Sequence, residues 1–168
     1  MSIKSSGLLL YRHDESTGAL ELLIGHMGGP FFARKHQHGW SIPKGLAESG
    51  DSDLVAVAER EFTEEMGSAP PPGETFELGS AKSGRKTIVI FAREGDFDLS
   101  TFHSNVFEME WPRGSGQMQS FPEIDKADWV DADAARTLLV KSQGVFIDRL
   151  LAALSLASVE SGHAPDDS

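Results

Sequence analysis

The chain contains no cysteine among its 168 residues, so disulfide bonds and thiolate chemistry are excluded. Long apolar runs are missing as well. The early run from Leu8 to Leu10 is too short for the apolar region of a signal peptide or for a membrane span. The sequence therefore predicts no membrane association, and we expect the protein to reside in the cytoplasm.

Positive charge is scarce, because 15 Lys and Arg residues face 26 Asp and Glu residues and give a formal net charge of −11. Such a field repels phosphate backbones and anionic lipids, so we expect no broad nucleic-acid or membrane binding. A nucleotide bound together with a metal ion stays possible, since the cation supplies local positive charge. The pattern Gly-x4-Gly-Lys-Ser/Thr is also absent, which excludes a P-loop phosphatase.

The length predicts a single domain over residues 1–157 with a substantial core, and the polar segment 158–168 is expected to be a disordered tail. Segments 27–39 and 96–119 have no regular pattern and are predicted to be irregular. The predicted strands are 7–12, 20–26, 76–82, 86–93 and a short one that ends at 129–130. The predicted helices are 53–66, 132–140 and 145–156. Strands interspersed with helices in this way favour an α/β sandwich.

The predicted helix 53–66 carries carboxylates on the face that it should turn toward the core. Its apolar stripe is formed by Leu54, Val55, Val57, Ala58 and Phe62. Glu61, Glu65 and, at the margin, Glu64 fall on the same sector of the helix. Unpaired carboxylates so placed repel one another and lose hydration, at a cost on the order of several kcal/mol. A hard divalent cation such as Mg²⁺ would compensate, while the alternative is a solvated acidic helix end.

The residues around this helix resemble the signature of the Nudix hydrolases, Gly-x5-Glu-x7-Arg-Glu-U-x-Glu-Glu-x-Gly-U, where U is a bulky apolar residue. The matching positions are Gly45, Arg60, Glu61, Phe62, Glu64, Glu65 and Gly67. The outer glutamate of the signature falls on Asp51 or on Ser52, depending on the end from which it is counted, so that ligand is shortened or missing. The final apolar position is Ser68.

The resemblance extends over roughly Ser5 to Leu151 and points to a bacterial subgroup labelled predicted NTP pyrophosphohydrolases. The segments that carry this wider resemblance are 6–12, 28–35, 107–112 and 121–125. The resemblance implies an α/β fold, the Nudix-type α/β/α sandwich with a central mixed β-sheet.

The resemblance also implies a metal site. Mg²⁺, with Mn²⁺ as a substitute, would be held by Glu61, Glu64, Glu65 and the backbone carbonyl of Gly45. Arg60 would orient a glutamate through charge-assisted hydrogen bonds, and Glu64 at i+4 is the expected partner.

Many Nudix enzymes add an acid from a distant loop, as a metal ligand or a general base. Glu123 lies six residues before Trp129 and resembles that acid. Glu108 and Glu110 are competitors, because residues two apart share a face of an extended chain. The sequence leaves open which carboxylate deprotonates the attacking water.

Substrate binding calls for cations near the phosphates and aromatic rings near a base. Lys44, Arg34 and Lys35 are the cationic candidates. Trp40, with Phe31 and Phe32, could stack on a base, unless these rings fill the core instead.

The sequence therefore predicts a metal-dependent pyrophosphohydrolase that cleaves a diphosphate linkage in a nucleoside diphosphate derivative. The favoured substrates are an NTP or dNTP, or a dinucleoside polyphosphate, bound by a monomer or a homodimer. One alternative is a non-catalytic Nudix-like nucleotide sensor, and another is an interaction scaffold with an incidental acidic helix. The bond that is cleaved stays open.

Overall fold

A mixed β-sheet forms the centre of the computed structural model, which describes residues 3–161 and the side chains of residues 3–157. Five strands run in the order β3-β2-β1-β6-β5, while β4 pairs with β1 and β9 pairs with β2. The pairing of β1 with β6 is parallel and the other pairings in this sheet are antiparallel. The strands are β1 Ile3–His13, β2 Leu20–Met27, β3 Trp40–Ser41, β4 Lys44–Leu46, β5 Thr75–Ser83, β6 Lys86–Glu94 and β9 Ile124–Val130.

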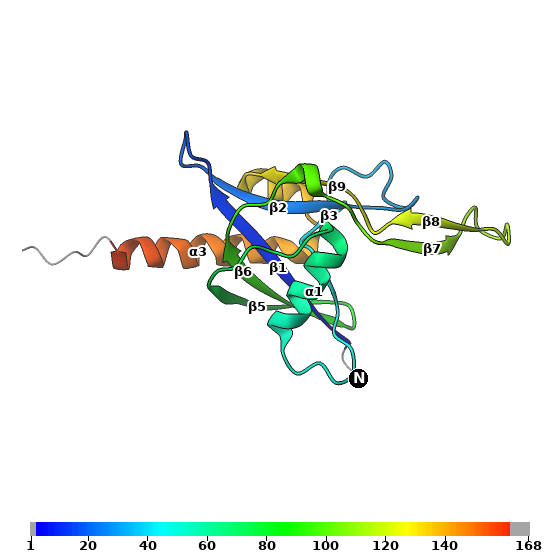
Figure 1. Cartoon of the computed structure of the whole chain (residues 1–168), viewed down its shortest axis with the longest axis horizontal. Helices are drawn as coiled ribbons and strands as arrows, with labels where there is room; N and C mark the ends of the chain where they lie inside the picture. Colours follow the sequence, from blue (N-terminus) through cyan, green and yellow to red (C-terminus); the bar gives the residue numbers. More distant parts are fainter. Residues whose placement is uncertain (1–2, 162–168) are drawn as a thin grey trace, which may run out of the picture.

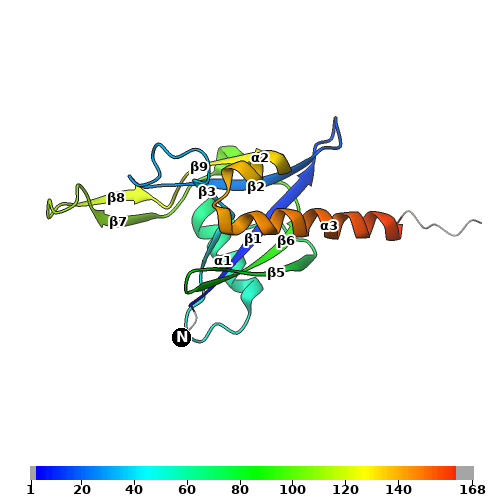
Figure 2. The ribbon, with the colours of Figure 1, turned by 180° about the vertical axis from the view of Figure 1, so that it is seen from behind.

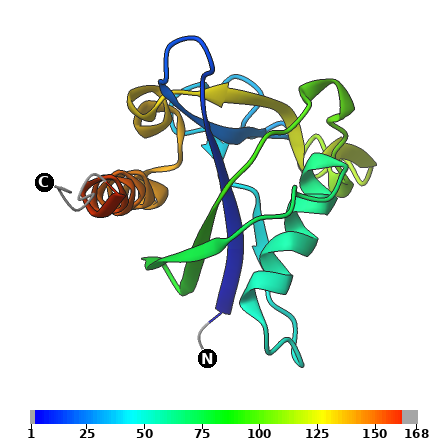
Figure 3. The same cartoon turned by 60° about the vertical axis from the view of Figure 1, so that its left-hand side comes forward.

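Helices cover both faces of the sheet, as predicted for an α/β/α sandwich (Figure 3). The helix α1 (Leu54–Met66) packs on one face, and α2 (Ala132–Leu138) and α3 (Gly144–Ser161) pack on the other. Alternate residues of β1 serve the two cores: Leu8 and Leu10 face α1, whereas Leu9 and Tyr11 face α2 and α3. None of the helices in the described part of the chain is long and apolar enough to cross a membrane.

The predicted boundaries of the helix that carries the carboxylates are confirmed. Asp53 caps its first turn by accepting hydrogen bonds from the backbone N–H groups of Val55 and Ala56, at 3.0 and 3.4 Å. Gly67 ends the helix with φ of 91° and donates its N–H to the Thr63 carbonyl. A side chain at Gly67 would also overlap the backbone of His103, which crosses the helix end.

The segment 96–119 is more regular than predicted. It contains a 3-10 turn, η1 (Leu99–Thr101), and the strand β7 (Val106–Glu110), which pairs with β8 (Met118–Pro122). These two strands form a ribbon that extends from the body of the molecule (Figures 1 and 2). Its strands were not predicted because their partners are each other and loop 28–39 rather than the core. We refer to β7 and β8 below as the ribbon.

The C-terminal helix is longer than predicted. Helix α3 continues through Ser161, past the expected domain end at residue 157. The remainder of the expected tail, residues 162–168, lies outside the described residues.

Candidate active site

The carboxylates of α1 meet the backbone of β4 at Lys44 and Gly45. Glu65 is only 7% exposed and accepts a hydrogen bond from the Lys44 backbone N–H at 3.3 Å. The Glu61 carboxylate lies so close to Gly45 that a Cβ at this position would overlap it. Glu64, at the margin of the stripe, is exposed. The helix therefore directs carboxylates toward the sheet, and a Cβ at Gly45 would displace the Glu61 carboxylate from its present position.

Burial disfavours the ionised form of both inward carboxyls. It raises the pKa of Glu65 to about 8, and the charges of Glu123 and Glu61 act in the same direction against the attraction of Lys44. Burial also raises the pKa of Glu61 to about 7, and the neighbouring Glu64 adds to this shift. Near neutral pH these carboxyls are therefore partly protonated, and a bound cation that replaced the protons would offset the cost of ionising them.

A chain of backbone hydrogen bonds places Glu123 beside this cluster. The Asn105 N–H donates to the Glu64 carbonyl at 2.9 Å, and the Glu123 N–H donates to the Asn105 carbonyl at 2.8 Å. On its other side, the Glu123 carbonyl accepts from the Gly28 N–H at 2.8 Å. Burial raises the pKa of Glu123, as does the nearby charge of Glu64. The fourth carboxyl group therefore interacts electrostatically with the helix carboxylates.

The two competing acids lie elsewhere. Glu108 and Glu110 are exposed on the ribbon, and the Glu110 carboxylate accepts a hydrogen bond from the Gly114 N–H. The structure thus brings Glu123, and neither ribbon glutamate, to the cluster.

The partner of Arg60 differs from the expected one. The Arg60 guanidinium contacts both oxygens of Asp51 at 3.3–3.4 Å, the Leu46 carbonyl at 3.3 Å and the Glu61 carboxylate at 3.7 Å, instead of Glu64. The expectation was wrong because the loop between β4 and α1 folds back on the helix and offers these acceptors. The Glu48 N–H and then Arg60 lower the pKa of Asp51. Asp51, rather than Ser52, therefore anchors this loop.

A cleft of about 360 Å³ adjoins the cluster through Lys44. Polar and apolar groups from several elements line it, and Phe32 supplies an aromatic ring. Its lining residues are Ser5, Met27, Phe32, Lys44, Ser83, Lys86, Ile88, Val140, Ser142 and Gln143. Apart from Lys44 and Phe32, none of these was singled out from the sequence, because no local pattern marks residues that only the folded sheet brings together.

The prediction that Trp40 contacts substrate does not fit its location. Trp40 is 3% exposed and belongs to the core cluster on the α2 and α3 side, so it has no face free for a base. Its short strand pairs with β2, and this pairing draws the ring inward. Arg34 and Lys35, in contrast, are exposed on loop 28–39. Phe31 is 52% exposed and packs edge-on against Trp111, which directly follows β7, with ring centroids 5.5 Å apart.

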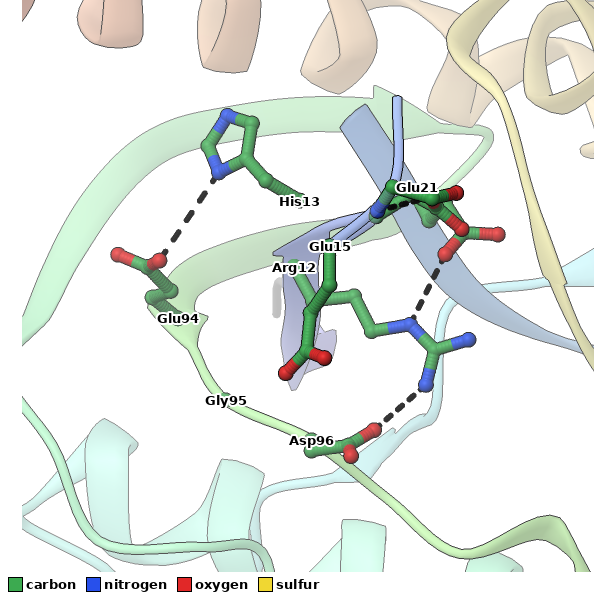
Figure 4. A pocket seen from close by; sticks show the side chains of 9 residues that line it. Arg12, His13, Glu15, Glu21, Glu94, Gly95 and Asp96 are labelled. Atoms are coloured by element: carbon green, nitrogen blue, oxygen red, sulfur yellow. Dashed lines mark hydrogen bonds and ion pairs between the residues drawn. The ribbon is translucent and has the colours of Figure 1, made fainter. Parts of the chain in front are cut away.

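A larger hollow, of about 560 Å³, lies near the turn between β1 and β2 (Figure 4). Arg12 lines this hollow, and its guanidinium pairs with Glu21 at 3.0 Å and with Asp96 at 2.6 Å. The guanidinium also lies over the Trp129 ring, 4.0 Å from the ring centroid. The Arg12 guanidinium is thus occupied by these two carboxylates, and none of the carboxylates of α1 lines the hollow. The hollow therefore lacks the carboxylate chemistry of the α1 cluster, although its volume is larger than that of the cleft beside Lys44.

The side chains of the cluster suit a divalent metal but need adjustment to bind one. Among the side chains of residues 3–157, no three acidic or histidine groups are close enough to hold an ion as they stand. The oxygen donors available are nevertheless of the kind that a hard cation prefers, and Glu61, Glu64, Glu65, Glu123 and the Gly45 carbonyl are the groups that could hold one. The raised carboxyl pKa values indicate that the site favours added positive charge.

Comparison with known proteins establishes the family. A family model described as NUDIX domain matches residues 7–150, so the chain belongs to the Nudix family. It is a hydrolase of the class that acts on pyrophosphate bonds in nucleoside diphosphate derivatives. A search of curated proteins finds no match.

Solved structures confirm the predicted fold. A mutT/nudix family protein from Listeria innocua superposes with a TM-score of 0.64 and 16% identity, over 94% of this chain and 97% of that one. The NUDIX domain of Shewanella oneidensis NrtR, complexed with ADP ribose, superposes with a TM-score of 0.62 and 14% identity, over 92% of this chain and 89% of that one. A C. elegans Ap4A hydrolase superposes with a TM-score of 0.58 and 19% identity, over 91% of this chain and 98% of that one.

Proposed function

We propose that this chain is a divalent-metal-dependent pyrophosphohydrolase of a nucleoside triphosphate or a dinucleoside polyphosphate. The observation that carries the proposal is the carboxylate cluster, in which Glu61 and the buried Glu65 face β4 and the nearby charge of Glu123 acts on both. A cluster with these raised pKa values costs stability at neutral pH, and groups perturbed in this way by burial and by neighbouring charges are concentrated at functional sites.

The chain's own residues have distinct roles in this proposal. Glu61, Glu64, Glu65 and the Gly45 carbonyl would hold Mg²⁺ or Mn²⁺, which, when bound, polarises the phosphate and lowers the pKa of a coordinated water. Arg60 would hold Glu61 in place from the loop side. Glu123 has a raised pKa and is the candidate to accept the proton of the attacking water.

The cleft beside Lys44 would take the nucleoside part of the substrate. Its volume lies in the range of small-molecule sites, about 300–1,000 Å³. Phe32 offers a face for a base, and the Lys44 and Lys86 ammonium groups would attract phosphates. Arg34 and Lys35 on the neighbouring loop would contact the distal part of a longer substrate. The Ap4A hydrolase among the structural neighbours makes dinucleoside polyphosphates a reasonable first choice.

The second candidate is a nucleotide sensor without turnover. It is favoured by the ADP ribose complex of the NrtR NUDIX domain, which shares the fold. The complete set of helix glutamates in this chain supports catalysis instead, because a sensor has no need of a water-activating metal.

The test is hydrolysis with Mg²⁺ across a panel of nucleotides. Phosphate and pyrophosphate release would be measured together with chromatographic separation of the nucleotide products, because a dinucleoside polyphosphate or ADP-ribose is cleaved into two phosphorylated products without free phosphate. The panel contains NTPs, oxidised dNTPs, dinucleoside polyphosphates, ADP-ribose and nucleotide sugars. Turnover by the wild type should be lost in Glu64→Gln/Glu65→Gln and kept in the matched control Glu108→Gln/Glu110→Gln on the ribbon. Metal-dependent nucleotide binding without any turnover would favour the sensor.

A further inference from the structure

His26, near the end of β2, links two segments of the proposed site. Its Nδ1 lies 2.7 Å from the Asp125 carboxylate, and its Nε2 lies 2.8 Å from the backbone carbonyl of Lys35. The ring packs edge-on against Trp40, with centroids 5.4 Å apart, and is largely buried. Both ring nitrogens therefore have protein partners, and the ring contacts neither the α1 carboxylates nor the cleft.

The Asp125 contact fixes an irregular point of β9. Pairing between β2 and β9 shifts by one residue after His26, which leaves Asp125 as a bulged residue without a pairing partner. A bulge redirects the chain that follows or precedes it. Glu123 lies directly beyond this bulge, where its carbonyl accepts from the Gly28 N–H. The His26–Asp125 contact thus holds the bulge two residues away from Glu123.

The second contact fixes loop 28–39. The Lys35 carbonyl turns inward to His26, and a Cβ at Gly39 would overlap that carbonyl. The Met27 N–H donates to the Gly39 carbonyl at 2.9 Å and closes the base of the loop. The loop carries Arg34 and the Lys35 ammonium, the cations proposed for substrate phosphates.

We propose that His26 is a positioning residue for hydrolysis, which holds Glu123 through Asp125 and holds the cationic loop through the Lys35 carbonyl. The inference rests on the proposed function, because it requires Glu123 to act in the reaction. It predicts two separable effects of removing the ring. The loss in kcat should depend on Glu123, while the rise in KM should not.

A double-mutant cycle measures these effects. The four proteins are wild type, His26→Ala, Glu123→Gln and the double variant, assayed with Mg²⁺ on diadenosine tetraphosphate or on ATP, whichever is turned over faster. We expect His26→Ala to lower kcat about 10- to 100-fold through misplacement, and Glu123→Gln to lower it about 100-fold or more. In the Glu123→Gln background, His26→Ala should cost less than about 3-fold in kcat and still raise KM.

Matched variants separate positioning from loss of stability. His36→Ala removes another ring that packs on Trp40, at 6.3 Å, without any contact to Asp125, and should change neither constant. Asp125→Asn keeps an acceptor for Nδ1 and should retain most of the activity. Asp125→Ala should lower kcat without the rise in KM. The Asp125 side chain is 36% exposed, so its removal should disturb folding less than removal of the buried His26 ring. Asp125→Ala can therefore replace His26→Ala in the double-mutant cycle if His26→Ala does not fold.

The outcomes distinguish failure of the inference from failure of the proposed function. The positioning role alone would be overturned if His26→Ala lowered kcat by the same factor in the Glu123→Gln background as in wild type. It would also be overturned if both His26→Ala and Asp125→Ala left kcat unchanged. Full activity of Glu123→Gln would overturn the role of Glu123 and the inference with it, and would leave the proposed function standing. No turnover by the wild type would overturn the proposed function itself.

Discussion

Gly45 shows at the scale of one residue how the backbone and the carboxylates of this site depend on each other. We predict that Gly45→Ala abolishes metal-dependent stabilisation and activity, because its Cβ would overlap the Glu61 carboxylate. Overpacking of this kind costs about 1–3 kcal/mol in the free energy of unfolding, which urea denaturation would measure. Gly144→Ala is the control, since a Cβ there meets no atom within 4 Å. Retained metal response in Gly45→Ala would count against the placement of the ligands.

Glu65 makes the metal-free protein sensitive to pH. Its pKa is raised from 4.5 to about 8 in the folded state, so the folded protein binds more protons than the unfolded chain between these values. Stability should therefore fall as pH rises from about 5 to 8, by on the order of a few kcal/mol. Urea unfolding in EDTA at pH 5.5, 7 and 8.5 would measure it. Glu65→Gln should flatten the slope, and an equal slope in both proteins would contradict the burial of this charge.

Individual residues differ in how far the sequence predicts them. The inward direction of Glu61 and Glu65 follows from helical periodicity alone, because all the residues involved lie on one helix. The partner of Arg60 does not, since Asp51 reaches it only after the loop folds back. Trp40 was misassigned for a similar reason: burial against β2 is a property of the sheet, and a tryptophan near glycines looks the same in either setting.

The short segment between η1 and β7 links the end of α1 to the start of β9 and helps to bring Glu123 to the site. Ser104 is buried there, accepts the Ile124 N–H at 3.0 Å and donates to the Asn105 carbonyl at 2.9 Å. We predict that Ser104→Ala lowers the free energy of unfolding by about 1–3 kcal/mol, because a buried N–H loses its partner, and also lowers kcat.

Ser100→Ala is the matched control for this prediction. Its hydroxyl bonds to Asp98 in an exposed turn, so its loss should leave stability within about 0.5 kcal/mol of wild type. Thermal and urea unfolding would compare the two variants. Equal effects of both substitutions would show that the connection is not held by Ser104.

Helices and strands with a periodic pattern of apolar residues could be predicted from the sequence. Strands that form only because the folded chain brings a partner beside them could not. The strand pairs β1–β2 and β5–β6 carry runs of apolar residues around polar turns, and α1 carries both of its caps in the sequence. Strands β3 and β4 have only two and three residues, too few for a pattern. The ribbon strand β7 packs Phe107 against Gly29 of loop 28–39, and nothing in its own sequence indicates that contact.

In the whole molecule, the carboxylate cluster and the adjoining cleft are built by different parts of the fold. Helix α1 and strand β4 bring carboxylates against glycine, while the sheet, loop 28–39 and the η2 turn (Lys141–Gln143) enclose the adjoining cleft. Glu123 and Glu61 meet only through this tertiary arrangement. The family resemblance, and not periodicity, was therefore what pointed to Glu123 from the sequence.

The most direct test of the central claim is the melting temperature with and without Mg²⁺ or Mn²⁺, for wild type and Glu64→Gln/Glu65→Gln. Metal at 100 times its Kd would add about 2.7 kcal/mol to the free energy of unfolding, which raises the melting temperature of a chain of this size by about 5–10 °C. We predict this increase in the wild type and in Glu108→Gln/Glu110→Gln, and its loss in a folded Glu64→Gln/Glu65→Gln variant. An equal increase in that variant, or none in the wild type, would contradict a metal site at the α1 carboxylates.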